Sequence, residues 1–196
     1  MSKAGFFNDG GIVDHSNDES DEAIFEKQFD LDLNNDGDKE DQVAFDERAY
    51  LFNGWDLLDD QLAGYLNALQ YDKMLVVMEP CFSGGFIADL RGENRVIVSA
   101  SSEYELSYGD GPGNHDMFSY HFTAALAGLT HDGASVNADS NNDGKVSMLE
   151  AFQYATSHDT AKENPYYEDN GDGRGHKNMA SPVDGDGLFG ATFFLD

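Results

Sequence analysis

Basic residues are scarce in this chain. Eleven lysines and arginines stand against 38 aspartates and glutamates, which gives a formal net charge of −27. Such a surface repels nucleic-acid phosphates and anionic membranes, so neither is expected as a partner. Long hydrophobic runs are missing too: no segment reaches the roughly 18 apolar residues of a membrane span, and the N-terminus lacks an apolar signal-peptide core. We therefore expect a soluble protein without membrane insertion, cytoplasmic as the sequence stands and extracellular if a further segment precedes it.

Cysteine is almost absent, since Cys81 is the only one, and this excludes an intrachain disulfide. The 196 residues, 40% of them hydrophobic, are enough for one domain with a real core. We predict a single domain over residues 1–196. It divides into an acidic, insert-rich segment (1–48), a sheet core (49–130) and a calcium loop with a C-terminal tail (131–196). No pattern predicts the oligomeric state.

Aspartate accounts for much of the negative charge, and it is set among asparagine and glycine. This mixture is typical of calcium loops, while a generally acidic surface adapted to high salt would explain the charge equally well. The sharpest example is DSNNDGKVSMLE, residues 139–150. It has the ligand spacing of an EF-hand loop, with Gly144 at the tight turn. The expected calcium ligands are Asp139, Asn141, Asp143, the Lys145 carbonyl, Ser147 and Glu150.

A second segment, residues 30–41, holds the opening half of the same motif. Its twelfth position is Val43, so the closing carboxylate is missing, and only Glu40 or Glu47 could replace it. The candidate ligands of this possible second site are Asp32, Asn34, Asp36 and Asp38. Further along, Asp169, Asn170 and Asp172 fit either another ion or a solvated turn, in a tail from Glu163 onward that reads as a long loop.

Two apolar runs, Met74–Met78 and 95–100, predict buried strands. A turn and a short helical segment separate them, which favours parallel pairing in an α/β sheet. Helices are expected over residues 57–69, 118–129 and 151–157. Cys81 comes directly after the first strand, at the edge of an open sheet where catalytic groups collect. It is either a nucleophile or a small buried residue.

The segments VVMEPCFSGGF and RVIVSASSEYELSY, with the calcium loop, resemble the caspase-like cysteine peptidases. Within them the chain is most similar to the legumain-like family and its prokaryotic members. The resemblance implies a caspase-like fold: an open, mostly parallel sheet flanked by helices, here without its N-terminal strands and with loop-rich calcium-binding insertions. It also implies Cys81 as the nucleophile.

The family's histidine lies in an Asp-His-Gly sequence upstream of the cysteine. Asp14-His15-Ser16 is the only Asp-His pair in that part of the chain. The resemblance therefore implies His15 as the catalytic partner, with the amides of Cys81 and Ser16 forming the oxyanion hole. Ser16 replaces the glycine, and its Cβ is a departure from the family pattern.

The family's substrate pocket implies Glu79 and Ser99, with Asp110 as a third candidate, and such an anionic pocket suits an asparagine or basic side chain. The expected function is a calcium-binding cysteine endopeptidase acting on peptides or proteins. The alternative is a catalytically inactive calcium-binding or scaffold domain, or a fragment of a larger peptidase.

Overall fold

The computed structural model describes residues 11–12, 47–50, 56–109, 115–177 and 179–195. In chain order its elements are β1 (Gly11–Ile12), β2 (Glu47–Tyr50), β3 (Asp56–Leu58), α2 (Asp59–Asn67), β4 (Met74–Met78), η2 (Ser83–Gly85), α3 (Phe86–Leu90), β5 (Arg95–Ser99), α4 (Met117–Ala127), α5 (Met148–His158), β6 (Tyr166–Glu168) and η4 (Gly190–Thr192).

The central sheet has the strand order β4-β5-β6. Strands β4 and β5 are parallel, in a register that pairs Met74 with Arg95 and Met78 with Ser99. Strand β6 is antiparallel to β5 and arises from a segment expected to be loop. A separate antiparallel sheet joins β1, β2 and β3. The α/β class is confirmed, and the parallel part of the described sheets is the single β4–β5 ladder.

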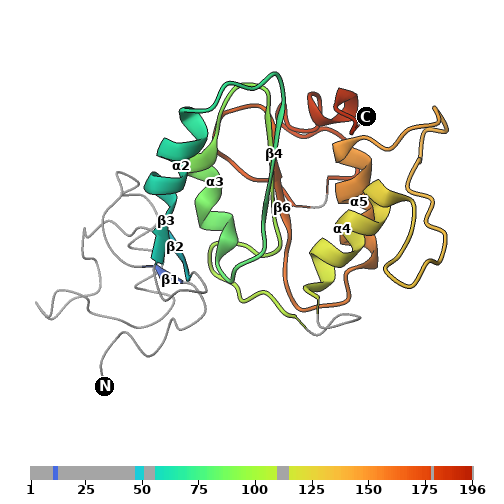
Figure 1. The fold of residues 1–196 in the computed structure, drawn as a ribbon, viewed down its shortest axis with the longest axis horizontal. Helices are drawn as coiled ribbons and strands as arrows, with labels where there is room; N and C mark the ends of the chain where they lie inside the picture. Colours follow the sequence, from blue (N-terminus) through green and yellow to red (C-terminus); the bar gives the residue numbers. More distant parts are fainter. Residues whose placement is uncertain (1–10, 13–46, 51–55, 110–114, 178, 196) are drawn as a thin grey trace, which may run out of the picture.

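Helices cover both faces of this central sheet, with α2 and α3 on one side and α4 and α5 on the other (Figure 1). Alternation along β5 explains the arrangement, because successive side chains of a strand point to opposite faces. Val96 and Val98 pack into the cluster formed with α4 and α5. Ile97 packs into the cluster with α2 and α3. All three are fully buried, so β5 is the centre of the core.

Helices α4 and α5 begin at side-chain caps, whereas α2 and α3 begin without one. Asp116 precedes α4, and its side chain accepts a hydrogen bond of 3.0 Å from the Ser119 amide. Ser147 and Glu150 form a reciprocal capping box at the start of α5. The helix predicted over residues 57–69 is α2, and its expected first residues belong instead to β3.

Several predicted site residues lie outside the described ranges. These are His15, Ser16, Asp110 and the possible second calcium site at Asp32, Asn34, Asp36 and Asp38. The ranges 1–48, 49–130 and 131–196 stay a prediction. Within the described part of the chain, no helix combines the length and apolar character needed to cross a bilayer.

Candidate active site

Cys81 lies three residues beyond the end of β4, in the turn that leads into η2 and α3. Its thiol is free, and the residue is partly exposed. The next residue, Phe82, has a left-handed backbone conformation with φ of 63°. Such a conformation is rare for a bulky side chain and marks a constrained turn. The strand therefore presents the sulfur at a sharp bend, as expected for a nucleophile at the carboxyl end of a strand.

Gly84 is required in this turn for a steric reason. A methyl group added at Gly84 would lie 2.7 Å from the Glu103 amide nitrogen and 2.8 Å from the backbone of Ser102. Contacts this short involve backbone atoms, which cannot swing away as a flexible side chain can. The glycine thus lets the turn after Cys81 pack directly against the segment that follows β5.

That segment, residues 102–108, runs beside the cysteine. The Cys81 sulfur lies 3.7 Å from the Ser107 carbonyl oxygen. The Phe82 amide donates a hydrogen bond of 2.7 Å to the Glu105 carbonyl oxygen. Among the described residues, the Cys81 amide has no hydrogen-bond acceptor. Contacts of Cys81 and Phe82 therefore fix the turn, and the Cys81 amide is left without an acceptor in the described part of the chain.

Ser99 lies beneath the site. It is fully buried, and its hydroxyl donates a hydrogen bond of 3.0 Å to the Ser101 carbonyl oxygen. The Ser101 amide donates to the Ser83 hydroxyl at 3.3 Å, which links this group to the cysteine turn. Ser99 therefore supports the turn from below, and the serine beside Glu79 is Ser107 instead.

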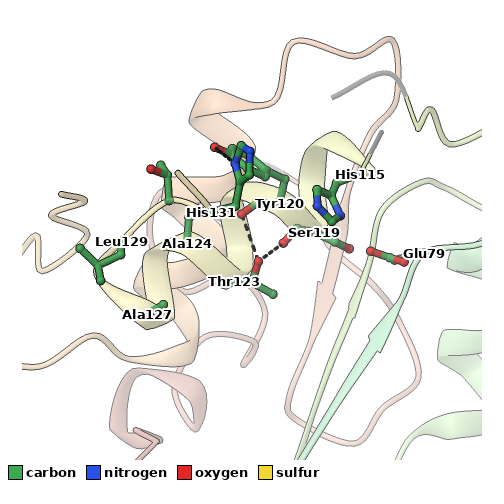
Figure 2. Close-up of a pocket in the computed structure, with 10 residues that line it drawn as sticks. Glu79, His115, Ser119, Tyr120, Thr123, Ala124, Ala127, Leu129 and His131 are labelled. Atoms are coloured by element: carbon green, nitrogen blue, oxygen red, sulfur yellow. Dashed lines mark hydrogen bonds between the residues drawn. The ribbon is translucent and has the colours of Figure 1, made fainter. Parts of the chain in front are cut away.

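A cavity of about 480 Å³ opens next to Glu79, along α4 (Figure 2). Glu79 is exposed at its rim, and His115 lies across from it in the view of Figure 2. Tyr120 and His131 form part of the wall, their rings 5.5 Å apart. The cavity thus combines a carboxylate, two imidazoles and a phenol within reach of the loop that carries Cys81.

Glu79 interacts electrostatically with Asp116, and Asp116 in turn with Glu163. The pKa of Asp116 is raised to about 6, first by burial and then by the charges of Glu79 and Asp159. Burial likewise raises the pKa of Glu163 well above its usual range, with added repulsion from Asp116 and Asp159. The Tyr108 amide donates a hydrogen bond of 2.9 Å to Glu163. Glu79 is therefore coupled to acidic side chains whose pKa values are raised.

The sequence interpretation did not identify Ser107, Asp116 or Glu163. Asp116 could have been recognised as a helix cap, because it immediately precedes the aromatic helix expected over residues 118–129. Its position beside Glu79 has no local signal, since the two residues are 37 positions apart in the chain. Glu163 lies just before strand β6, and the sequence predicted a long loop in that part of the chain instead of a strand.

The loop 139–150 folds around its own carboxylates. The first ligand position, Asp139, accepts hydrogen bonds from the amides of Asp143 and Gly144 at 3.1 Å and 2.9 Å. Glu150 closes the loop by accepting from the amides of Ser140 and Asn141 at 3.1 Å and 3.2 Å. The alternating oxygens therefore face the inside of the loop, as an EF-hand loop requires.

Within the described ranges, no group of three or more His, Cys, Asp or Glu side chains is placed to hold a metal ion. A calcium loop takes much of its coordination from asparagine, backbone carbonyls and water. Any ion in residues 139–150 would therefore depend on the Asn141 amide oxygen and the Lys145 carbonyl as well as on the three carboxylates.

Comparison with known families identifies the chain. Residues 33–172 match the Peptidase C13 family, which is about seven-tenths of the sequence and includes the whole Cys81 turn. The chain belongs to the peptidase C13 family. This C13 peptidase is a legumain-like enzyme of the cysteine type and has protein substrates, as the resemblance implied. The matched region includes Glu79 and the loop 139–150, and it begins after His15 and Ser16.

No curated protein matches this C13 peptidase, and no solved structure matches it either.

Proposed function

We propose that this C13 peptidase is an endopeptidase with Cys81 as its nucleophile and His15 as its general acid and base. The observation that carries the proposal is the position of Cys81. It lies partly exposed at a constrained bend after a buried parallel strand, in a chain of a cysteine-peptidase family.

In the reaction, the Cys81 thiolate attacks the carbonyl carbon of the scissile peptide bond. The bond between that carbon and the amide nitrogen then breaks, the electron pair stays on nitrogen, and His15 supplies the proton to the leaving amine. A water molecule, deprotonated by the same imidazole, attacks the resulting thioester. The carboxylate product leaves, and the thiol is regenerated.

The oxyanion of the tetrahedral intermediate would be held by the amides of Cys81 and Ser16. Support for the first donor is that the Cys81 amide has no acceptor among the described residues. The second donor rests on the Asp14-His15-Ser16 sequence, which is the match to the family's histidine motif.

The cavity beside Glu79 is proposed to bind the side chain that precedes the cleaved bond. Glu79 at the rim and Asp116 behind it would favour an asparagine or a basic side chain and disfavour an acidic one at neutral pH. Repulsion between the two carboxylates supports this, because it contributes to the raised pKa of Asp116. Asp110 remains a candidate, and Ser99 acts here only through the turn it supports.

We further propose calcium as a structural ion in the loop 139–150. Support comes from the ligand spacing and from the inward hydrogen bonding of Asp139 and Glu150. The ion would lock the start of α5, whose N-terminal capping box shares Glu150. Its contribution is to stability, and no step of the hydrolysis uses it.

An alkylating probe on a peptide ending in asparagine or arginine tests the nucleophile and its partner. We expect covalent labelling of Cys81 in the wild type. His15→Ala should lower the rates of labelling and hydrolysis by about 10²–10⁴-fold, the usual contribution of general acid–base catalysis. His158→Ala, which changes an exposed histidine on α5, serves as the matched control and should keep wild-type rates.

The outcomes separate the alternatives. Labelling that persists at the wild-type rate in His15→Ala would remove His15 from the mechanism. A folded wild type that neither labels nor hydrolyses peptides would contradict the endopeptidase and leave a calcium-binding or scaffold role.

A further inference from the structure

The loop that follows β6 repeats the sequence pattern of the loop at residues 139–145. In each loop an acidic residue is followed by asparagine at the third position, aspartate at the fifth and glycine at the sixth, with a basic residue at the seventh. The first loop has Asp139, Asn141, Asp143, Gly144 and Lys145; the second has Glu168, Asn170, Asp172, Gly173 and Arg174. The first position of the second loop is therefore Glu168, whereas Asp169 was the residue suggested by the sequence.

The two loops also share their backbone conformation. At the fourth position the left-handed residues are Asn142, with φ of 60°, and Gly171, with φ of 81°. At the sixth position they are Gly144, with φ of 88°, and Gly173, with φ of 79°. A chain that turns left-handed twice at the same spacing carries its first, third and fifth side chains to the same side.

Two hydrogen bonds recur in both loops. In both, the asparagine side-chain oxygen accepts from the amide two residues on, and the following aspartate does the same. The distances are 2.8 Å (Asn141 to the Asp143 amide), 2.9 Å (Asp143 to the Lys145 amide), 2.7 Å (Asn170 to the Asp172 amide) and 2.8 Å (Asp172 to the Arg174 amide).

Asp186 takes the place that Glu150 has in the first loop. Glu150 accepts from the amides of the second and third loop residues. Asp186 likewise accepts from the amides of Asp169 and Asn170, at 2.8 Å and 3.1 Å. Asp186 is fully buried, and its second oxygen lies 2.8 Å from Nδ1 of His176. The closing carboxylate thus comes from a separate segment, so no twelve-residue motif marks the loop in the sequence.

An observation independent of the loop geometry points to a bound cation. The Glu168 side chain is fully buried. One carboxylate oxygen accepts a hydrogen bond from the Gly171 amide, while the other is buried without a hydrogen-bond partner among the described residues. The negative charges of Asp186 and Asp172 also act on the Glu168 carboxyl group. A buried, unsatisfied carboxylate beside two others is costly unless a cation or a proton compensates it.

We propose that this loop binds a second calcium ion through the carboxylates of Glu168 and Asp172, the side-chain oxygen of Asn170 and the carbonyl of Arg174, while Asp186 closes the loop through its hydrogen bonds to the amides of Asp169 and Asn170. An all-oxygen set that mixes carboxylates, an amide and a carbonyl in a flexible loop suits Ca²⁺ better than Mg²⁺, which demands stricter octahedral geometry. The ion would accept the orphan oxygen of Glu168 and offset the repulsion among the three carboxylates.

The loop's position gives the ion a structural role. A methyl group added at Gly173 would lie 3.0 Å from the Arg91 side chain and 3.3 Å from Ala88, so the loop packs on the end of α3. Helix α3 follows the Cys81 turn directly. Next to Glu168, Asp169 accepts from the Gly187 and Gly190 amides at 2.9 Å and 2.6 Å, which ties in the C-terminal segment. Calcium would therefore stabilise the packing of the loop after β6 against α3, the helix that follows the Cys81 turn.

Counting bound calcium by equilibrium dialysis of the full chain tests the proposal. Asp172→Ala should lose one equivalent of calcium relative to the wild type. Glu168→Gln should lose the same equivalent, because glutamine keeps the shape and an acceptor for the glycine amides but not the charge. Asp139→Ala should lose a different equivalent, so Asp139→Ala/Asp172→Ala loses two. Asp72→Ala, which removes an exposed aspartate outside both loops, should lose none.

The melting temperature in a chelator separates binding from folding. Without calcium, Glu168→Gln should be at least as stable as the wild type, since it removes the buried charge. If Asp172→Ala and Glu168→Gln are folded and bind as many calcium ions as the wild type, the proposal is wrong, and Glu168 is a buried protonated acid that the protein keeps for structure alone. The result does not depend on peptidase activity.

Discussion

The hydroxyl of Ser107 donates a hydrogen bond of 2.5 Å to the carbonyl oxygen of Glu79. The carbonyl oxygen of the same serine lies 3.7 Å from the Cys81 sulfur. Ser107 thus connects the segment after β5 to Cys81 and to Glu79 at the rim of the cavity. Strands β4 and β5 are parallel neighbours, so the segment that carries Cys81 and the segment that carries Ser107 leave the sheet at the same edge.

Ser107→Ala should loosen this connection. Loss of one hydrogen bond corresponds to about 1 kcal/mol, so we expect kcat/KM for peptide hydrolysis to fall by roughly fivefold. Ser157→Ala is a suitable control, because that exposed hydroxyl donates to the Tyr154 carbonyl oxygen within α5 and is remote from the site. An unchanged kcat/KM in Ser107→Ala would show that the bond does not position the cysteine turn.

Gly84→Ala should disturb the cysteine turn. The added methyl group would lie 2.7 Å from the Glu103 amide nitrogen, and overpacking of this kind costs about 1–3 kcal/mol. We expect a lower melting temperature and a loss of peptidase activity. The matched control is Gly64→Ala in α2, where nothing lies within 4 Å and alanine should stabilise the helix by up to about 1 kcal/mol. Equal effects of the two substitutions on activity would contradict the steric role of Gly84.

Glu163→Gln should change the pH dependence of stability. The folded-state pKa of Glu163 is raised, first by burial and then by the charges of Asp116 and Asp159. A raised carboxyl pKa favours the folded state at low pH, and this contribution is lost as the pH rises through the folded pKa. The stability of the variant relative to the wild type should therefore increase progressively between about pH 5 and pH 9, by at least about 1.4 kcal/mol in total, which corresponds to one pKa unit.

Urea unfolding at several pH values measures this difference. Glutamine retains an oxygen that can accept from the Tyr108 amide, so the hydrogen bond itself is preserved. Glu93→Gln, at an exposed position, should change stability by less than about 0.5 kcal/mol at every pH. A Glu163→Gln advantage that does not grow with pH would mean that Glu163 is not held protonated.

Calcium should raise the melting temperature of the wild type. At a calcium concentration 100 times the dissociation constant, one site contributes about 2.7 kcal/mol, or about 5–10 °C for a chain of this size. Asp139→Ala should remove the share that belongs to the loop 139–150, whereas Asp72→Ala should keep the full rise. Stability that rises with sodium chloride and not with calcium would favour adaptation to high salt as the reason for the acidic composition.

The local features of this chain were readable from its sequence. Apolar runs predicted β4 and β5 with a turn and a short helical segment between them, because strand burial and turn chemistry depend on near neighbours along the chain. The segments VVMEPCFSGGF and RVIVSASSEYELSY were enough to indicate the family. The ligand spacing of residues 139–150 was equally local. The position of Cys81 after a strand and the ligand spacing of the loop 139–150 could therefore be predicted from the sequence by itself.

Tertiary structure decided which distant residues meet. The family resemblance implied Ser99 for the pocket; in the structure Ser99 is fully buried, and Ser107 donates a hydrogen bond to the Glu79 carbonyl oxygen. Where the chain returns to the sheet as β6, Glu163 accepts a hydrogen bond from the Tyr108 amide. Asp186 accepts hydrogen bonds from the amides of Asp169 and Asn170, in the loop that follows β6. Each of these contacts joins residues far apart in the chain and depends on the order β4-β5-β6. Spacing along the sequence carries no information about such contacts, because only the packed sheet brings its edges and loops together.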